Sequence, residues 1–198
     1  MPLFKLEHSR TAYRADFVFY SSVVVILAVF LLVDSPRSQR LEIMSLTVLG
    51  LLSWSVIEYA LHRFVLHGLQ PFRRWHMEHH QRPRALIGTP TILSGTLIAL
   101  LVFLPALLWA DLWSTCAFML GLLTGYQIYA VTHHAIHHWH ADTAWLRQRK
   151  RWHALHHHTQ RSGCYGVTSP FWDYIFGSTR PADAPTTFNK GKFLPRKF

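Results

Sequence analysis

The stretch that decides the fold is residues 112–140, LWSTCAFMLGLLTGYQIYAVTHHAIHHWH, in which a long apolar run ends in five histidines. Residues 112–132 contain no Lys, Arg, Asp or Glu over 21 positions. A helix needs about 20 apolar residues to cross the hydrocarbon core of a bilayer. The stretch therefore predicts a transmembrane helix that carries a dense set of imidazoles at one end.

Three further runs without a charged residue lie at residues 17–33, 43–57 and 85–110. The second run continues through Glu58 towards His67, and the third covers 26 positions. Runs of this length are typical of membrane spans and disfavour the core helices of a soluble protein. The first run is not expected to be a cleaved signal peptide, because no small-residue cleavage site follows it. Together the runs predict an all-α integral membrane protein with four transmembrane helices.

The distribution of basic residues predicts the orientation of these helices. The chain has 20 Lys plus Arg against 10 Asp plus Glu, but the basic residues lie in blocks between the apolar runs, which favours a membrane over nucleic acid as the partner. Residues 1–16 hold three basic residues, the segment after the second run holds five, and residues 139–198 hold ten. The opposite side has only Arg37 and Arg40. By the positive-inside rule, both termini are expected on the cytoplasmic side.

A chain of 198 residues is long enough for one domain. Residues 1–16 are expected to form a cytoplasmic N-terminus, and residues from about 17 to 138 the transmembrane helices with the first two or three histidine groups. Residues 139–178 are expected to form a cytoplasmic cap, and residues 179–198 a solvated tail. Cys116 and Cys164 lie too far apart in this topology for a disulfide and fit a reducing compartment.

Histidines dominate the chemistry of the chain, since fourteen of the 15 fall between positions 62 and 158. They form four groups: His62 and His67; His76, His79 and His80; His133, His134, His137, His138 and His140; His153, His156, His157 and His158. The predicted topology brings all four groups to the cytoplasmic side of the membrane.

The spacing within each group has a geometric meaning. Residues at i, i+3 and i+4 fall within an arc of about 100° on a helix. Each HxxHH triplet, at residues 76–80 and 153–157, is therefore expected to aim three imidazoles at one point. In the third group the pairs 133/137 and 134/138 point in different directions, and the spacing leaves open which pair is used.

His62 and His67 are five residues apart, so their rings converge only if the helix bends or ends between them. Gly68 is well placed to end it.

The histidine density predicts metal binding, because neutral imidazoles are costly to bury unless a cation takes their lone pairs. Two, three, two and three convergent ligands are too many for one ion and predict two ions with about five imidazoles each. Between His62 and His158 the only acids are Glu78, Asp111 and Asp142. This scarcity excludes the carboxylate-rich dimetal site of ferritin-like bundles.

Three sequence patterns accompany the histidine groups. The first pattern is Glu58, Tyr59, His62, Arg63 and Phe64. The second is Gly125, Tyr126, Tyr129, Thr132, His133 and His137. The third is Gly163, Tyr165, Gly166, Val167, Thr168, Ser169, Trp172, Asp173, Phe176 and Gly177. With the histidine groups, these patterns resemble the fatty acid hydroxylase and sterol desaturase superfamily, with a close match to the catalytic domain of fatty acid 2-hydroxylases over about residues 54–177. One departure is Ala130, where the family pattern has Asp.

The resemblance implies a membrane enzyme that hydroxylates an aliphatic C–H bond of a lipid acyl chain with O₂ and external electrons. It implies two bound iron ions, with zinc as a substitute in purified protein, and it selects the pair 133/137. The implied ligands are His62, His67, His76, His79, His80, His133, His137, His153, His156 and His157, with no catalytic residue beyond them. Residues expected beside the metals, either as alternative ligands or as hydrogen-bond partners of the ligands, are Glu58, His134, His138, His140, His158 and Asp173, and the expected substrate contacts are Tyr126 and Tyr129. Glu58, one turn before His62, is expected to orient its ring or to pair with Arg63.

The cytochrome domain that is fused to some members of the family is absent from this chain, so a separate redox partner of the cytochrome or ferredoxin type is expected, and no nucleic acid. Two alternative functions stay open at this point. One is a carotenoid or sterol hydroxylase or desaturase of the same superfamily. The other is a non-catalytic, histidine-rich metal-binding membrane protein, although a transporter would need polar residues at mid-membrane.

Overall fold

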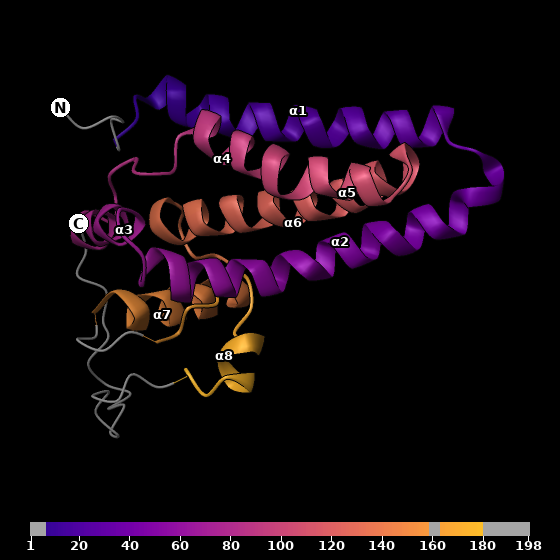
Figure 1. Ribbon diagram of the computed structural model, residues 1–198. Helices are drawn as coiled ribbons and strands as arrows, with labels where there is room; N and C mark the ends of the chain where they lie inside the picture. The colour runs from indigo at the N-terminus through magenta and orange to yellow at the C-terminus, as the bar shows by residue number, and fades with distance from the viewer. Residues whose placement is uncertain (1–6, 159–162, 180–198) are drawn as a thin grey trace.

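The computed structural model describes residues 7–158 and 163–179 of the protein, which form helices joined by short loops (Figure 1). In chain order the helices are α1 (Arg10–Asp34), η1 (Arg37–Gln39), α2 (Arg40–Ala60), η2 (Leu61–Leu66), α3 (Phe72–Gln81), α4 (Thr91–Ile98), η3 (Ala99–Phe103), α5 (Leu104–Trp109), α6 (Leu112–His138), α7 (Ala144–His158) and α8 (Phe171–Ile175). The helices η2 and η3 are π-helical turns. Apart from one bridge between Glu7 and Ile87, the described residues show no β pairing, so the all-α prediction is confirmed.

Four helical segments are long and apolar enough to cross a membrane: Arg10–Asp34, Arg37–Leu66, Thr91–Trp109 and Leu112–His138. This confirms the four predicted spans. The third begins at Thr91, later than the start of its apolar run, because Pro90 precedes the helix as its N-cap. The fourth begins immediately after Asp111, whose side chain caps the backbone N–H groups of Trp113 and Ser114. This cap makes the connection between the last two spans very short.

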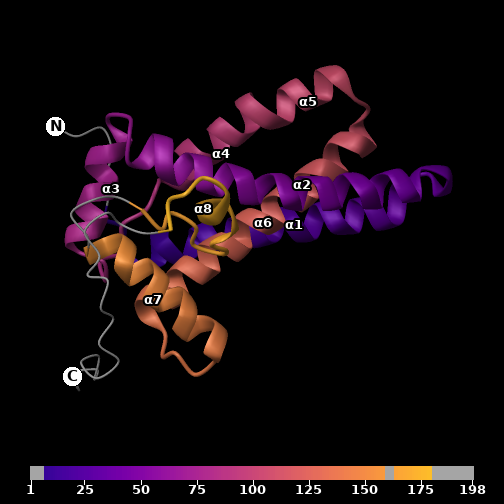
Figure 2. The ribbon, with the colours of Figure 1, turned by 90° about the horizontal axis from the view of Figure 1, so that it is seen from below.

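The long segments run side by side, and α3 and α7 gather at one end of them (Figures 1 and 2). Half of the most apolar window of α6 is buried in the protein, compared with none of the window in Thr91–Trp109. The segment made of α4, η3 and α5 therefore lies at the periphery with its side chains available to lipid, and α6 is the central helix. The histidine-rich end of α6 points towards the same end of the bundle as α3 and α7.

The helices α2 and α6 pack with their backbones in direct contact. A Cβ atom on Gly121 would lie 1.9 Å from the carbonyl oxygen of Thr47, and one on Gly50 would lie 2.1 Å from that of Phe118. Small residues at such crossings let membrane helices approach closely. Next to this crossing, Trp54 of α2 packs in a core with Tyr20, Met119, Leu122 and Leu123. This contact fixes the ends of α2 and α6, from which histidines project, relative to each other.

The two cysteines, Cys116 and Cys164, are both buried and free, as predicted. Cys116 packs with Leu31 and Ala117 in a second apolar cluster, away from the described histidine-rich end.

We predict that Gly121→Ala destabilises the protein by roughly 1–3 kcal/mol, the usual cost of overpacking, because the new methyl group meets backbone atoms that cannot rotate away. Thermal unfolding in detergent measures the effect. The matched control is Gly95→Ala in α4, where an added Cβ has its nearest neighbour at 3.8 Å. The two variants unfolding at the same temperature would contradict a direct α2–α6 backbone contact.

Candidate metal centre

Nine histidines converge in two groups, and within each group the ligand nitrogens lie within 4.8 Å of one another. The five-histidine group consists of His62, His67, His76, His80 and His156. The four-histidine group consists of His79, His133, His137 and His153. Each group draws on three parts of the chain, with α3 and α7 contributing to both, η2 and its C-cap to the first, and α6 to the second. Side chains separated by up to 94 positions thus meet at one end of the bundle.

The prediction that each HxxHH triplet aims at a single point is wrong. In α3, His76 and His80 belong to the five-histidine group, whereas His79 belongs to the four-histidine group. In α7, His156 belongs to the five-histidine group and His153 to the four-histidine group. The arc of about 100° spanned by i, i+3 and i+4 is wide enough for one helix to serve two centres that lie on either side of it. As a result, α3 and α7 hold the two groups together.

His157, the tenth predicted ligand, belongs to neither group but contacts both. Its Nε2 lies 2.9 Å from Nε2 of His153, and its ring stacks on that of His80 with centroids 4.1 Å apart. It lies at the junction of the two groups, and its role as a ligand stays a prediction.

His62 and His67 converge, and the helix ends between them as expected, because η2 stops at Leu66 and His67 is its C-cap. The backbone N–H of His67 donates to the carbonyl of His62 at 3.2 Å, an i→i+5 bond of the π-helical turn η2. A π turn widens the helix so that residues five apart share a face. The two ring centroids are consequently 5.3 Å apart.

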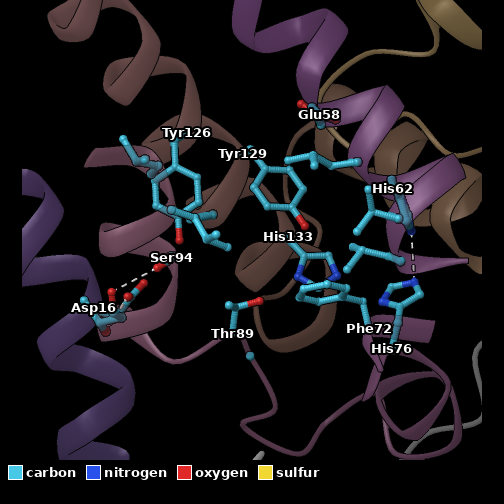
Figure 3. Close-up of a pocket in the computed structure, with 18 of the residues that line it drawn as sticks. Asp16, Glu58, His62, Phe72, His76, Thr89, Ser94, Tyr126, Tyr129 and His133 are labelled. Carbon is cyan, nitrogen blue, oxygen red and sulfur yellow. Dashed lines mark hydrogen bonds between the residues drawn. The ribbon is translucent and has the colours of Figure 1, made fainter. Parts of the chain in front are cut away.

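A loop after α7 sets the tautomers of two histidines. Nδ1 of His62 lies 2.6 Å from the carbonyl oxygen of Tyr165, and Nδ1 of His156 lies 2.8 Å from that of Gly163. A carbonyl only accepts, so each Nδ1 donates, and the Nε2 of a neutral ring then carries a lone pair. These lone pairs face other imidazoles, because Nε2 of His62 is 3.0 Å from Nε2 of His76 (Figure 3).

The packing of nitrogens in the five-histidine group fits a cation. Nε2 of His76 lies 3.0 Å from the Nε2 atoms of both His62 and His80, although a single N–H donates to only one of them. In the four-histidine group both ring nitrogens of His79 are buried without a hydrogen-bond partner among the described residues. Buried lone pairs that face each other are costly unless a metal takes them. An all-imidazole donor set suits iron or zinc.

Burial keeps these imidazoles neutral. Together with a smaller effect of nearby His80, it lowers the pKa of His67 and His79 to about 4 and that of His156 to about 3. The pKa values of His76 and His153 also lie well below the usual value, mainly through burial. Neutral imidazole is the form that binds a metal, so the site is ready for metal at pH 7.

Glu58 does not orient His62 as predicted. Its buried carboxylate accepts hydrogen bonds from the backbone N–H groups of Val167 and Thr168 at 2.8 and 2.9 Å and from the Thr168 hydroxyl at 2.6 Å. Its other expected partner, Arg63, donates to the Tyr59 hydroxyl instead. The N–H groups of the buried loop need acceptors, and the Glu58 carboxylate binds them instead of the His62 imidazole. The ring contact comes from the Tyr165 carbonyl, which side-chain motifs do not reveal.

Asp173 has a similar relation to the loop. It is fully buried and accepts from the N–H groups of Tyr165 at 2.9 Å and Gly166 at 2.8 Å and from the Ser178 hydroxyl at 2.7 Å. It belongs to neither histidine group, so the structure disfavours it as an alternative ligand. Both acids therefore hold the loop whose carbonyls contact His62 and His156.

Three other predicted histidines, His134, His138 and His140, belong to neither of the two groups. Nδ1 of His134 lies 3.2 Å from the Tyr13 hydroxyl, and its ring stacks on His138 with centroids 4.5 Å apart. His140 is exposed, and the side chain of His158 lies outside the described residues. Of the two pairs that the spacing left open, His133 and His137 therefore face the centre.

A cavity of about 430 Å³ leads to the histidines from the membrane-spanning helices. Its walls include His62, His76, His79 and His133, and apolar side chains of η3 and α6 such as Leu101 and Leu122. Figure 3 shows Tyr126 and Tyr129, both predicted substrate contacts, between the histidines and a polar end with Asp16 and Ser94. The ring of Tyr129 stacks on that of His133 with centroids 5.9 Å apart. Ala130, the departure from the motif, also lines this cavity.

The family described as fatty acid hydroxylase matches residues 47–178 of the chain, which confirms the resemblance drawn from the motifs. The dihydroceramide fatty acyl 2-hydroxylase FAH2 of Arabidopsis thaliana is 33% identical over 140 residues, which cover 65% of this chain and 58% of that protein. The ceramide very long chain fatty acid hydroxylase scs7 of Schizosaccharomyces pombe is 30% identical over 68% of this chain and 42% of its own length. The chain thus spans about half the length of these relatives.

A solved structure titled full length scs7p, with only the hydroxylase domain visible, is similar to this fold. The TM-score is 0.75 and the identity 29%, over 89% of this chain and 69% of that one. The similarity therefore extends over the spans as well as the histidine-rich end.

We predict that acid destabilises the protein through these histidines. Their pKa values of about 3 to 4 in the folded state lie below the ordinary value of 6.5, so the unfolded chain binds more protons as pH falls from about 6.5 towards 4. One such buried group loses roughly 1 kcal/mol of unfolding free energy per pH unit in this window. Thermal unfolding of metal-free protein at pH 7.5 and 5 measures it.

The variant His79→Gln should flatten this dependence, while His140→Ala should leave it unchanged, because His140 is exposed. Equal stability of the unaltered chain at both pH values would contradict the buried, neutral state of the groups.

Proposed function

The chain belongs to the fatty acid hydroxylase family, and from that premise we propose that it is a membrane-embedded dimetal oxygenase that hydroxylates an aliphatic C–H bond of a lipid acyl chain. The observation that carries the proposal is the shared wall between the cavity and the metal centre. His62 and His76 of the five-histidine group and His79 and His133 of the four-histidine group line the same cavity as apolar side chains of the spans. A hydrocarbon chain that enters from the bilayer can thus reach both groups.

Two iron ions are the proposed metals, one for each histidine group, with His157 as a further ligand at their junction. When bound, the iron pair supplies the reduction of O₂ that makes an oxidant strong enough for an unactivated C–H bond. Imidazole also binds zinc, which is expected to replace iron in part of the purified protein. The proposal thus assigns ten histidines to two ions.

The chain's own residues bind and orient the substrate. The apolar walls of the cavity, including Leu97, Leu101 and Val102 of the third span, exclude water from the acyl chain. Tyr129 restricts His133 by stacking on it, and Tyr126 lies beside Trp54 and Tyr20 in the same wall. These aromatic rings position the chain, and the carbonyls of Tyr165 and Gly163 orient the imidazoles.

The proposed substrate is a fatty acyl chain, either free or carried by a sphingolipid. The relatives named above are, by their names, a dihydroceramide fatty acyl 2-hydroxylase and a ceramide hydroxylase, and these names favour acyl substrates over carotenoids or sterols. A non-catalytic metal-binding protein is disfavoured because it has no need for an apolar cavity of about 430 Å³ against both groups.

We place both termini and the metal centre on the cytoplasmic side, as the basic segments indicate. The helices that carry the central histidines also expose arginines: Arg73 and Arg74 on α3, and Arg147 and Arg151 on α7. A positive surface close to the metals favours the encounter with an acidic electron donor, such as a cytochrome or ferredoxin-type protein. Electrons from the cytosol and a lipid from the bilayer would then meet at the same site.

We predict that cells that express the chain gain 2-hydroxylated acyl lipids, detected by lipid mass spectrometry, and that the gain requires O₂. His156→Ala should abolish the product and lower the metal content, because His156 belongs to the five-histidine group. The matched control is His140→Ala, an exposed histidine outside both groups, which should retain activity. Unchanged lipids in cells with folded, metal-loaded protein would refute the proposal.

We also predict that Ala130→Trp blocks hydroxylation but leaves both ions bound. Ala130 lines the cavity and belongs to neither histidine group, so a bulky ring there displaces the acyl chain alone. Product formation and metal content are measured on the same preparation. The control is Ile128→Trp on the same helix, where the side chain is 48% exposed and lies outside this cavity. Full activity of Ala130→Trp would exclude the cavity as the substrate site.

A further inference from the structure

One peptide unit in the loop after α7 is hydrogen-bonded at both ends. The carbonyl of Tyr165 accepts from Nδ1 of His62 at 2.6 Å, and the N–H of Gly166, in the same peptide, donates to Oδ2 of Asp173 at 2.8 Å. In a trans peptide the C=O and N–H groups point in opposite directions. A continuous chain of hydrogen bonds therefore runs from the Asp173 carboxylate through this peptide to the imidazole of His62.

Asp173 has the contacts of a negatively charged carboxylate. Each hydrogen bond found for its side chain comes from a donor: the N–H groups of Tyr165 and Gly166, the Ser178 hydroxyl, and more weakly the Trp152 indole at 3.4 Å. An ionised carboxylate only accepts, as these contacts require. The side chain is fully buried, and no ion pair reaches it within the described ranges. Its charge therefore acts mainly on the groups that it binds.

His156 offers an internal comparison in the same five-histidine group. Its Nδ1 also donates to a loop carbonyl, that of Gly163 at 2.8 Å. The N–H of that peptide, on Cys164, donates to the backbone carbonyl of Ser178 at 2.8 Å. The chain from His156 thus ends on a neutral group, whereas the chain from His62 ends on a charge.

The approach of the carboxylate depends on the absence of a side chain at position 166. A Cβ atom on Gly166 would lie 2.0 Å from the carbonyl oxygen of Ser169 and 2.9 Å from Oδ2 of Asp173. Any other residue there would push the carboxylate away from the peptide. The glycine and the acid thus work as one unit.

We propose that Asp173 is a positioning residue for the metal ion of the five-histidine group. Through the peptide between Tyr165 and Gly166, it holds His62 in the Nδ1–H tautomer and strengthens Nε2 as a metal ligand. Carboxylates that contact a metal-bound histidine directly raise its basicity, and chains of hydrogen bonds polarise one another. The proposal rests on the metal centre proposed above and adds a charge that acts on one of its two ions.

The test compares zinc dissociation constants for the two ions, measured by chelator competition on the full chain in detergent. His62→Gln and His137→Gln identify which ion belongs to which group. Asp173→Asn should raise the zinc dissociation constant of the five-histidine group by roughly tenfold and leave that of the four-histidine group within about twofold of its original value. Ser178→Ala, which removes a different hydrogen bond to the same carboxylate, should leave both within about twofold.

If Asp173→Asn raised both zinc dissociation constants equally, the cause would be a general loss of structure, and the proposal would be overturned. No change in either constant would also overturn it. An unaltered chain that binds no zinc would instead refute the metal centre itself, so the two failures are distinguishable.

A second measurement reads the tautomer of His62 in the chain with Asp173 unaltered. Nitrogen NMR of metal-free protein labelled at histidine reports the tautomer of each ring, and His62→Gln assigns the signal. The unaltered chain should show His62 as the Nδ1–H form with a strongly shifted proton. That proton shift should decrease in Asp173→Asn and persist in Ser178→Ala. An Nε2–H form of His62 in the unaltered chain would overturn the proposal.

Discussion

The structure depends on one constraint: uncharged imidazoles from distant parts of the chain point their lone pairs at one another in a buried space. Burial holds the pKa of His67 and His79 near 4, so proton charge does not separate the rings. Without a cation, protons cannot serve both 3.0 Å contacts of His76 Nε2, one with His62 Nε2 and one with His80 Nε2, so at least one of them gains nothing from its proximity. The same arrangement becomes favourable when a metal binds the lone pairs. Metal binding would therefore offset the free energy that the fold spends on burying these imidazoles together.

The sharing of α3 and α7 follows from this constraint. Each helix gives ligands to both groups, so neither group can be moved without the other. The i, i+3, i+4 spacing, read as an aim at one point, is better understood as a way to span two neighbouring centres from one helix. His157, which contacts His153 of one group and His80 of the other, occupies the junction that such sharing creates. The two shared helices thus hold the two histidine groups close together.

The spans and the four histidine groups could be predicted from the sequence, because both depend on side-chain type and spacing, whereas the choice of His133 and His137 needed the family resemblance. Apolar runs identify spans by length, and the structure has all four. The π turn at His62 and the roles of Glu58 and Asp173 could not be predicted in this way. A π turn, and an acid that accepts hydrogen bonds from backbone N–H groups, depend on backbone contacts. The spacing of side chains in the sequence does not indicate these contacts.

The position of Ala130 shows why a departure from a family motif need not disturb the metal centre. Its neighbours along α6, Tyr129 and His133, contribute a stacking ring and a member of the four-histidine group. Ala130 itself lines the cavity and belongs to neither histidine group, so an acid there would face the proposed substrate. The carboxylates that hold the loop beside His62 and His156 belong to other helices, Glu58 to α2 and Asp173 to α8. A change at Ala130 on α6 therefore leaves the contacts of that loop in place.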